Sequence, residues 1–154
     1  MEHLIFFLLL SWMSFLFAKV EIAIEGQRGW AEKLPTWHLP KGHRLSKLLV
    51  GGRPLTGYHV WIQIFVFSFL HIVYLFTDFN LKVELVLLSF FVLFWVFEDF
   101  LWFVLNPAFG IKNFKKEKIW WHKDHWWLIA PREYFIFIPL GVTLYLLSVG
   151  IVSY

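Results

Sequence analysis

Four long runs of apolar residues divide the chain, and few charged residues interrupt them. The runs cover approximately residues 4–24, 58–77, 83–105 and 134–152. A helix needs about 20 apolar residues to cross a bilayer core of about 30 Å. The pattern therefore predicts an all-α integral membrane protein. We expect one domain over residues 1–154, with four transmembrane helices in a bundle and with connections that lie at the membrane interface.

The ends of these runs carry turn and stop signals. Pro107 disfavours helical geometry in Asn106, so the third run should end there. Gly26 follows Glu25 directly, and glycine commonly terminates helices. Residues 78–80 read Asp-Phe-Asn, which favours a tight turn. The second and third helices should therefore form an antiparallel hairpin.

Composition points to the same class of protein. Hydrophobic residues make up 59% of the chain, compared with about 45–50% in soluble domains. Cysteine is absent, which excludes disulfides, thiolate metal ligands and a cysteine nucleophile. No basic segment precedes the first run and no Ala-x-Ala site follows it. We therefore expect this run to stay in the protein as a span and not to be removed as a signal peptide.

Basic residues are concentrated in two connections. The chain has 14 Lys and Arg in total, of which only Lys19 and Lys82 lie elsewhere. The others are Arg28, Lys33, Lys41, Arg44, Lys47 and Arg53 in the first connection, and Lys112, Lys115, Lys116, Lys118, Lys123 and Arg132 in the second. The positive-inside rule places both connections in the cytoplasm and both termini outside. These connections favour contact with membrane lipid, whereas the chain has no basic domain for a nucleic acid.

Four acidic residues lie within or at the end of apolar runs. Glu21 and Glu25 are one helical turn apart in the first run, and Glu98 and Asp99 are embedded in the third. A charge at membrane depth costs roughly 2.5–3.5 kcal/mol on insertion scales, so such residues commonly mark a site. Both runs should pass from outside to inside. Counted from Leu4 and Val83, Glu21 and Glu98 then lie at similar depths of about 25 Å and about 23 Å.

His122 and His125 follow in a segment rich in tryptophan. Residues 111–127 are expected to form a short interfacial helix, on which positions i and i+3 share a face and can bind one metal ion. A plain interfacial anchor is the alternative interpretation. His59 is a candidate extra ligand, while His71 lies deeper and outside the predicted site. Residues 26–40 are expected to lie at the head groups, either as a lid over the site or as a simple connector.

These residues together predict a small membrane metalloenzyme. The metal ligands are expected to be Glu21, Glu25, Glu98, Asp99, His122 and His125. Glu25 and Asp99 are also candidates for a general base. Oxygen and nitrogen ligands suit Fe, Mn or Zn. A site that opens to the inner leaflet predicts a lipid or another amphipathic substrate, with oxidation as the chemistry of a di-iron centre and hydrolysis as that of zinc.

The alternative is a membrane protein without catalytic activity. It would be a carrier of metal ions or protons, or a subunit of a larger assembly. A carrier should have polar groups across the whole membrane, and the spans offer only a few, such as Ser68 and His71. The spans are also poor in the small residues that favour helix association. Metal identity and number, the substrate and the oligomeric state, a homo-oligomer included, are left open by the sequence.

Overall fold

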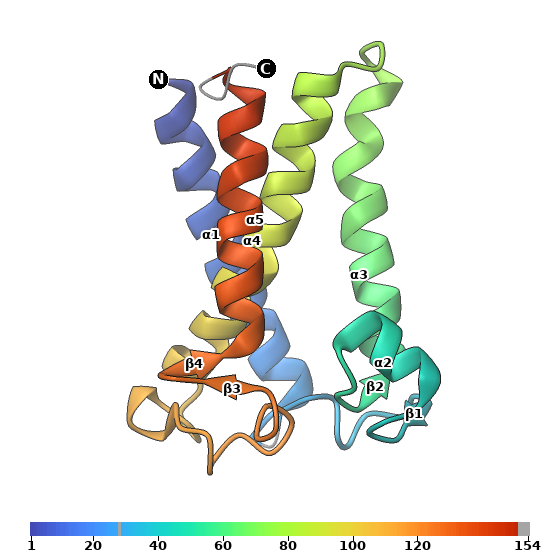
Figure 1. Ribbon diagram of the computed structural model, residues 1–154, viewed down its shortest axis with the longest axis vertical. Helices are drawn as coiled ribbons and strands as arrows, with labels where there is room; N and C mark the ends of the chain where they lie inside the picture. Colours follow the sequence, from blue (N-terminus) through green and yellow to red (C-terminus); the bar gives the residue numbers. More distant parts are fainter. Residues whose placement is uncertain (28, 151–154) are drawn as a thin grey trace.

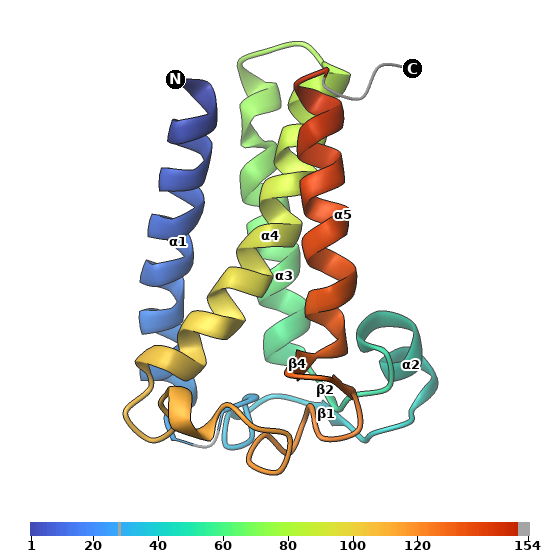
Figure 2. The ribbon, with the colours of Figure 1, turned by 60° about the vertical axis from the view of Figure 1, so that its left-hand side comes forward.

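The computed structural model describes residues 1–27 and 29–150, and the protein is mostly helical. Three helices are long and apolar enough to cross a membrane, and they coincide with the first three predicted runs. These are α1 (Glu2–Glu25), α3 (Gly57–Leu70) with its continuation in the 3-10 helix η1 (His71–Leu75), and α4 (Leu81–Leu105). A shorter helix, α5 (Arg132–Ser148), runs beside α4 (Figures 1 and 2).

The predicted fourth span is the part of the fold that the structure supports least fully. Helix α5 has 17 residues and contains Pro139. It would measure about 26 Å, slightly less than the thickness of a bilayer core. The predicted run continued to residue 152, but residues 151–154 lie outside the described part of the chain, as does Arg28 in the first connection. The crossing of the membrane by α5 therefore stays a prediction.

Local side-chain chemistry sets the ends of the long helices. The Asn80 carboxamide oxygen accepts hydrogen bonds from the backbone N–H groups of Lys82 and Val83, at 2.9 and 3.4 Å, where α4 begins. The same helix ends at Asn106, just before Pro107, as predicted. Helix α1 ends at Gly26, whose φ of 69° suits glycine. These residues therefore set where α1 ends and where α4 begins and ends.

The two connections carry the short elements, and both lie at one end of the long helices (Figure 1). The first connection contains β1 (His38–Leu39), α2 (Arg44–Val50) and β2 (Leu55–Thr56), and the second contains η2 (Ile111–Asn113), β3 (Trp126–Trp127) and β4 (Ala130–Pro131). Strand β1 pairs antiparallel with β2, and β3 with β4. The start of α1, the end of α5 and residues 76–80 lie at the opposite end, as expected for helices that alternate in direction.

The expected interfacial helix over residues 111–127 is wrong. Only Ile111–Asn113 is helical, and it is a single 3-10 turn. The backbone N–H groups of His122 and His125 donate to the carbonyls of Ile119 and His122, at 3.1 and 2.8 Å. These bonds span three residues and close separate turns, so His122 and His125 do not share a helix face.

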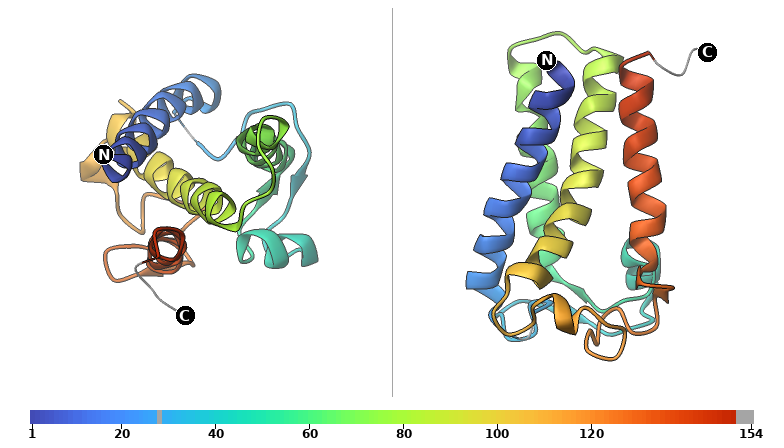
Figure 3. Two further views of the ribbon diagram at one scale, coloured as in Figure 1. Left: turned by 90° about the horizontal axis from the view of Figure 1, so that it is seen from above. Right: turned by 90° about the vertical axis from the view of Figure 1, so that its left-hand side faces the viewer.

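Helix α4 is the centre of the packing (Figure 3). It contacts α1 along one side and α5 along another, whereas α3 touches it less and stands apart. Near the middle of both helices, Gly141 of α5 lies against Leu93 of α4, and its carbonyl accepts a hydrogen bond of 2.8 Å from the Ser89 hydroxyl. Near the connections, the helices and both connections share a hydrophobic core that contains Ala18, Trp30, Trp102, Phe103, Ile119 and Trp121.

Candidate functional site

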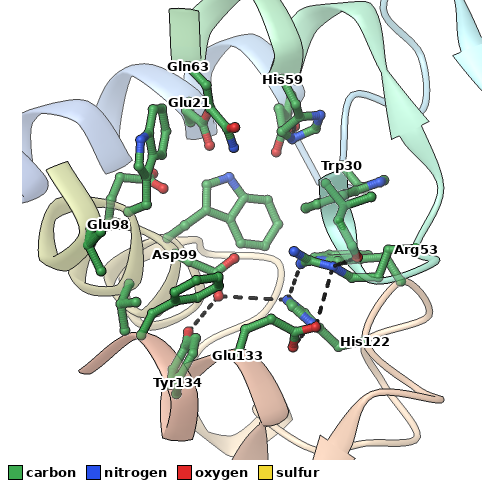
Figure 4. A pocket seen from close by; sticks show the side chains of 18 of the residues that line it. Glu21, Trp30, Arg53, His59, Gln63, Glu98, Asp99, His122, Glu133 and Tyr134 are labelled. Carbon is green, nitrogen blue, oxygen red and sulfur yellow. Dashed lines mark hydrogen bonds and ion pairs between the residues drawn. The ribbon is translucent and has the colours of Figure 1, made fainter. Parts of the chain in front are cut away.

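A cavity of about 210 Å³ lies at the connection end of the helices (Figure 4). Side chains from α1, α3, α4, α5 and both connections line it. Its polar lining residues are Glu21, Glu25, Arg53, His59, Gln63, Glu98, Asp99, His122, Glu133 and Tyr134. Five of the six predicted metal ligands therefore border one cavity. The exception is His125.

Glu98 and Asp99 are neighbours in α4 but serve opposite sides of the cavity. Adjacent helix residues differ in direction by about 100°. Glu98 turns toward α1, where its carboxyl group is within hydrogen-bonding reach of Glu21. Asp99 turns toward α5, where its Oδ2 accepts a hydrogen bond of 2.5 Å from the Tyr134 hydroxyl. Helix α4 thereby places two carboxylates on two walls.

On the first wall, the acids of α1 meet the start of α3. The Tyr58 hydroxyl donates to Glu21 Oε1 at 3.1 Å. Glu25 Oε1 lies 3.4 Å from His59 Nε2 and accepts the backbone N–H of Ala31 at 2.6 Å. Ala31 has a φ of 50°, an uncommon conformation for a residue with a side chain. Glu25 therefore also stabilises the tight turn that follows α1.

On the second wall, His122 lies between two acids. Its Nε2 is 3.8 Å from Asp99 Oδ2, and its Nδ1 is 3.8 Å from Glu133 Oε2. The imidazole is 1% exposed, although it belongs to a connection and not to a helix. The backbone turns around residues 119–125 hold this position. Asp99 keeps 26% of its side-chain surface accessible, and that surface faces the cavity that it lines.

Arg53 is the only lysine or arginine that lines the cavity among the described residues. Its Nε lies 3.9 Å from Glu133 Oε1, its Nη1 lies 3.5 Å from His122 Nε2, and its guanidinium sits 4.8 Å from the centre of the Trp30 ring. Burial lowers the pKa of the Arg53 guanidinium, although the Glu133 and Asp99 carboxylates oppose this change. Arginine nevertheless stays protonated in proteins, so Arg53 supplies one fixed positive charge.

The cavity holds more acids than this charge can balance. Five carboxyl groups line it, and full ionisation would leave an excess of four negative charges over Arg53. Even two protonated imidazoles, His59 and His122, would leave an excess of two. Buried charges without partners cost several kcal/mol each. The site therefore needs bound protons or bound cations.

Six buried polar atoms of the lining residues have no hydrogen-bond partner: Glu98 Oε1, His122 Nδ1, Glu133 Oε2 and the indole Nε1 atoms of Trp95, Trp102 and Trp121. Glu98 is only 3% exposed, and buried polar atoms are almost always paired. Within residues 1–27 and 29–150, however, no three His, Asp or Glu side chains converge closely enough to hold a metal ion. Metal binding would require these side chains to rotate toward one another.

His125 lies outside the cavity lining. Its ring is beside Gly52 of the first connection. Burial lowers the pKa of His125, and Arg132 and Arg53 add to this effect against the opposing charge of Glu133. An ion pair between Lys41 and Asp124 also joins the two connections. This side of the second connection thus holds the connections together and leaves His122 to face the acids.

Several lining residues were not predicted from the sequence, notably Arg53, Glu133 and Tyr134. Arg53 follows Gly51 and Gly52, a turn signal that gives no indication of burial. Glu133 and Tyr134 immediately precede the last apolar run, where polar residues at a helix start are ordinary. Residues 26–40 were expected to form either a lid or a connector, and Trp30 from this segment covers part of the cavity and stacks on His59 with ring centres 4.2 Å apart.

Comparison with known protein families, with curated proteins and with solved structures finds no match to this chain. The function must therefore be argued from the cavity itself.

Proposed function

We propose that this chain is a small integral-membrane metalloenzyme that acts on a lipid or another amphipathic substrate. In this proposal, α5 is the fourth span, the basic connections face the cytoplasm, and the cavity lies at the inner leaflet. The main support for this proposal is that, among the described residues, five carboxyl groups but only one arginine line the cavity, and that Glu98 Oε1 and His122 Nδ1 have no hydrogen-bond partner. Two divalent cations would neutralise the four excess negative charges, whereas one would leave two, and bound metal would give both atoms a partner.

The candidate ligands are Glu21, Glu98 and His122, and Asp99 and Glu133 line the same cavity. Carboxylate and imidazole ligands suit Fe, Mn or Zn. The bound metal would supply oxidation chemistry as a di-iron pair, or a hydrolytic hydroxide as zinc. Of the two predicted bases, the contacts favour Asp99. Asp99 faces the cavity and lies near His122, whereas Glu25 already accepts a hydrogen bond from the backbone N–H of Ala31.

A carrier of ions is supported less well. The next polar cluster along α4 is at Glu84, which contacts His71 Nε2 at 3.2 Å and accepts from the Tyr74 hydroxyl at 2.9 Å. Glu84 and Glu98 are about 21 Å apart along the helix. The intervening α4 residues that line the cavity include Phe91, Val92 and Trp95, which give an ion no ligands.

Elemental analysis of the purified protein tests the proposal. We expect bound metal in the unmodified chain, and we expect Glu21→Gln, Glu98→Gln and His122→Ala each to remove most of it. The triple variant should lose little more than one single variant, because ligands of one centre do not act additively. Glu84→Gln is the matched control, since it removes an acid from α4 outside the cavity.

A protein that binds no metal under any loading condition would contradict the proposal. Additive losses of metal across the three single variants would contradict a common centre.

A further inference from the structure

The cavity has a second, apolar end that reaches into the membrane. Its walls there are Phe91 and Val92 of α4 and Phe137 of α5. At about 1.5 Å per residue, Val92 lies about 20 Å from the end of α4 at Leu105. The carboxylates are near the interface, so the cavity joins a polar end to an apolar end at bilayer depth. This gradient matches one molecule with a polar head and a hydrocarbon chain.

The apolar end opens sideways, between α3 and α5. Gln63 and Phe137 both line the cavity and are also exposed at the surface of the helices, so the cavity reaches that surface. Helix α3 makes this opening available because it packs only lightly on α4 and none of the residues in its most apolar stretch is buried (Figure 3). In a bilayer, a surface at this depth faces lipid chains and not water.

The charges at the polar end restrict the head group. Arg53, the only lining cation among the described residues, is already engaged by Glu133 and by the Trp30 ring. With two divalent cations bound, their charge and that of Arg53 balance the five carboxylates, so an anionic phosphate or carboxylate head, or an ammonium head, would bring an unbalanced charge into the cavity. A hydroxyl or carbonyl head fits, and the Gln63 amide, which points into the cavity in Figure 4, can donate to it or accept from it.

The size of the cavity restricts the rest of the ligand. About 210 Å³ is less than the roughly 300–1,000 Å³ of ordinary ligand pockets. The cavity can therefore hold a head group and the first carbons of one chain, while the remaining chain stays in the bilayer.

We propose that the substrate is a single-chain amphiphile with an uncharged oxygen head group, such as a long-chain alcohol or aldehyde, and that it enters from the inner leaflet between α3 and α5. The choice of an uncharged head rests on the proposed function, because metal must first neutralise the acids. The route of entry rests on the geometry of the helices alone.

Photo-crosslinking in nanodiscs tests both parts. The probe is hexadecanol with a diazirine in its chain, and its attachment sites are mapped by mass spectrometry. Hexadecanol, hexadecylamine and hexadecyl phosphate serve as competitors, and metal content is measured in the same samples. We expect attachment to α3 and α4 at the cavity, and hexadecanol should compete best, by about tenfold over the phosphate, a modest difference in binding.

Two substitutions on α4 supply the matched comparison. Val92→Trp fills the apolar end and should reduce cavity labelling by about tenfold, as expected for overpacking. Val104→Trp adds the same bulk on the same helix at a residue that is 36% exposed and outside the lining, and it should leave labelling unchanged. Attachment to the unmodified chain gives a readout that does not depend on the folding of either variant.

The outcomes separate this inference from the proposed function. Labels confined to other helix faces, or equal labelling of the two variants in a metal-loaded protein, would overturn lateral entry while the metal centre stands. A metal-loaded protein that prefers hexadecyl phosphate would overturn the uncharged head group. A metal-free protein that prefers hexadecylamine would overturn both the proposed function and the head group.

Discussion

Replacing Arg53 by methionine should destabilise the protein strongly. The Arg53 and Glu133 side chains are 13% and 12% exposed, so the substitution removes the buried cation and leaves Glu133 only the more exposed Arg132, whose Nη2 lies 3.5 Å from its Oε1. Removing one partner of a buried ion pair typically costs about 3–5 kcal/mol. Loss of the guanidinium from the Trp30 ring acts in the same direction and contributes about 0.5–2 kcal/mol in comparable contacts. We therefore expect the free energy of unfolding to fall by about 3–5 kcal/mol.

The assay is reversible unfolding in detergent, carried out with a chelator so that loss of metal does not contribute. Arg44→Met on α2 is the matched control, because Arg44 is exposed and should change stability by less than about 0.5 kcal/mol. The double variant Arg53→Met with Glu133→Gln should recover a large part of the loss, since the carboxylate that Arg53 neutralised is then removed as well. A stable Arg53→Met protein, or a double variant that simply adds the two losses, would refute the charge argument.

Two further predictions concern topology and packing. In intact cells, cysteines introduced at the exposed positions Lys33 and Glu117 should resist an impermeant thiol reagent, whereas one at Asp78 should react, because the basic connections are predicted to be cytoplasmic. The reverse labelling would invert the predicted orientation. The native chain has no cysteine, so it gives no background labelling. Gly141→Ala would place a Cβ 2.5 Å from Leu93 Cγ and should cost about 1–3 kcal/mol in an unfolding titration; an unchanged free energy of unfolding would show that α4 and α5 do not pack this closely.

The sequence predicted the helical part of the site well because a helix has a fixed rise per residue. Depth arithmetic from Leu4 and Val83 placed Glu21 and Glu98 at one level, and the structure brings their carboxyl groups within hydrogen-bonding reach. The cap at Asn106 fixed where α4 ends. A rigid element therefore turns a sequence position directly into a position in space.

The connections could not be predicted in the same way, because an irregular chain has no such fixed rise. The spacing of His122 and His125 suggested a shared helix face, but separate turns direct the two rings to different places. The burial of Arg53 depends on acids that are remote in sequence, including Asp99 and Glu133. Its role becomes visible only when the helices are assembled.

The site also has a consequence for synthesis of the chain, because its walls come from the first and the last long helix. At about 5–20 residues per second, the roughly 110 residues between Glu21 and Glu133 take roughly 6 to 22 s to synthesise. During that interval α1 is at the membrane. Its Glu21 lacks the Tyr58 hydroxyl until α3 is made, and Arg53 lacks Glu133 until α5 is made. Any cation that the complete cavity holds is also absent. The nascent chain must therefore keep the acids at the end of α1 in contact with water or protonated until α5 is synthesised, and on the proposed function a metal ion would bind only after that.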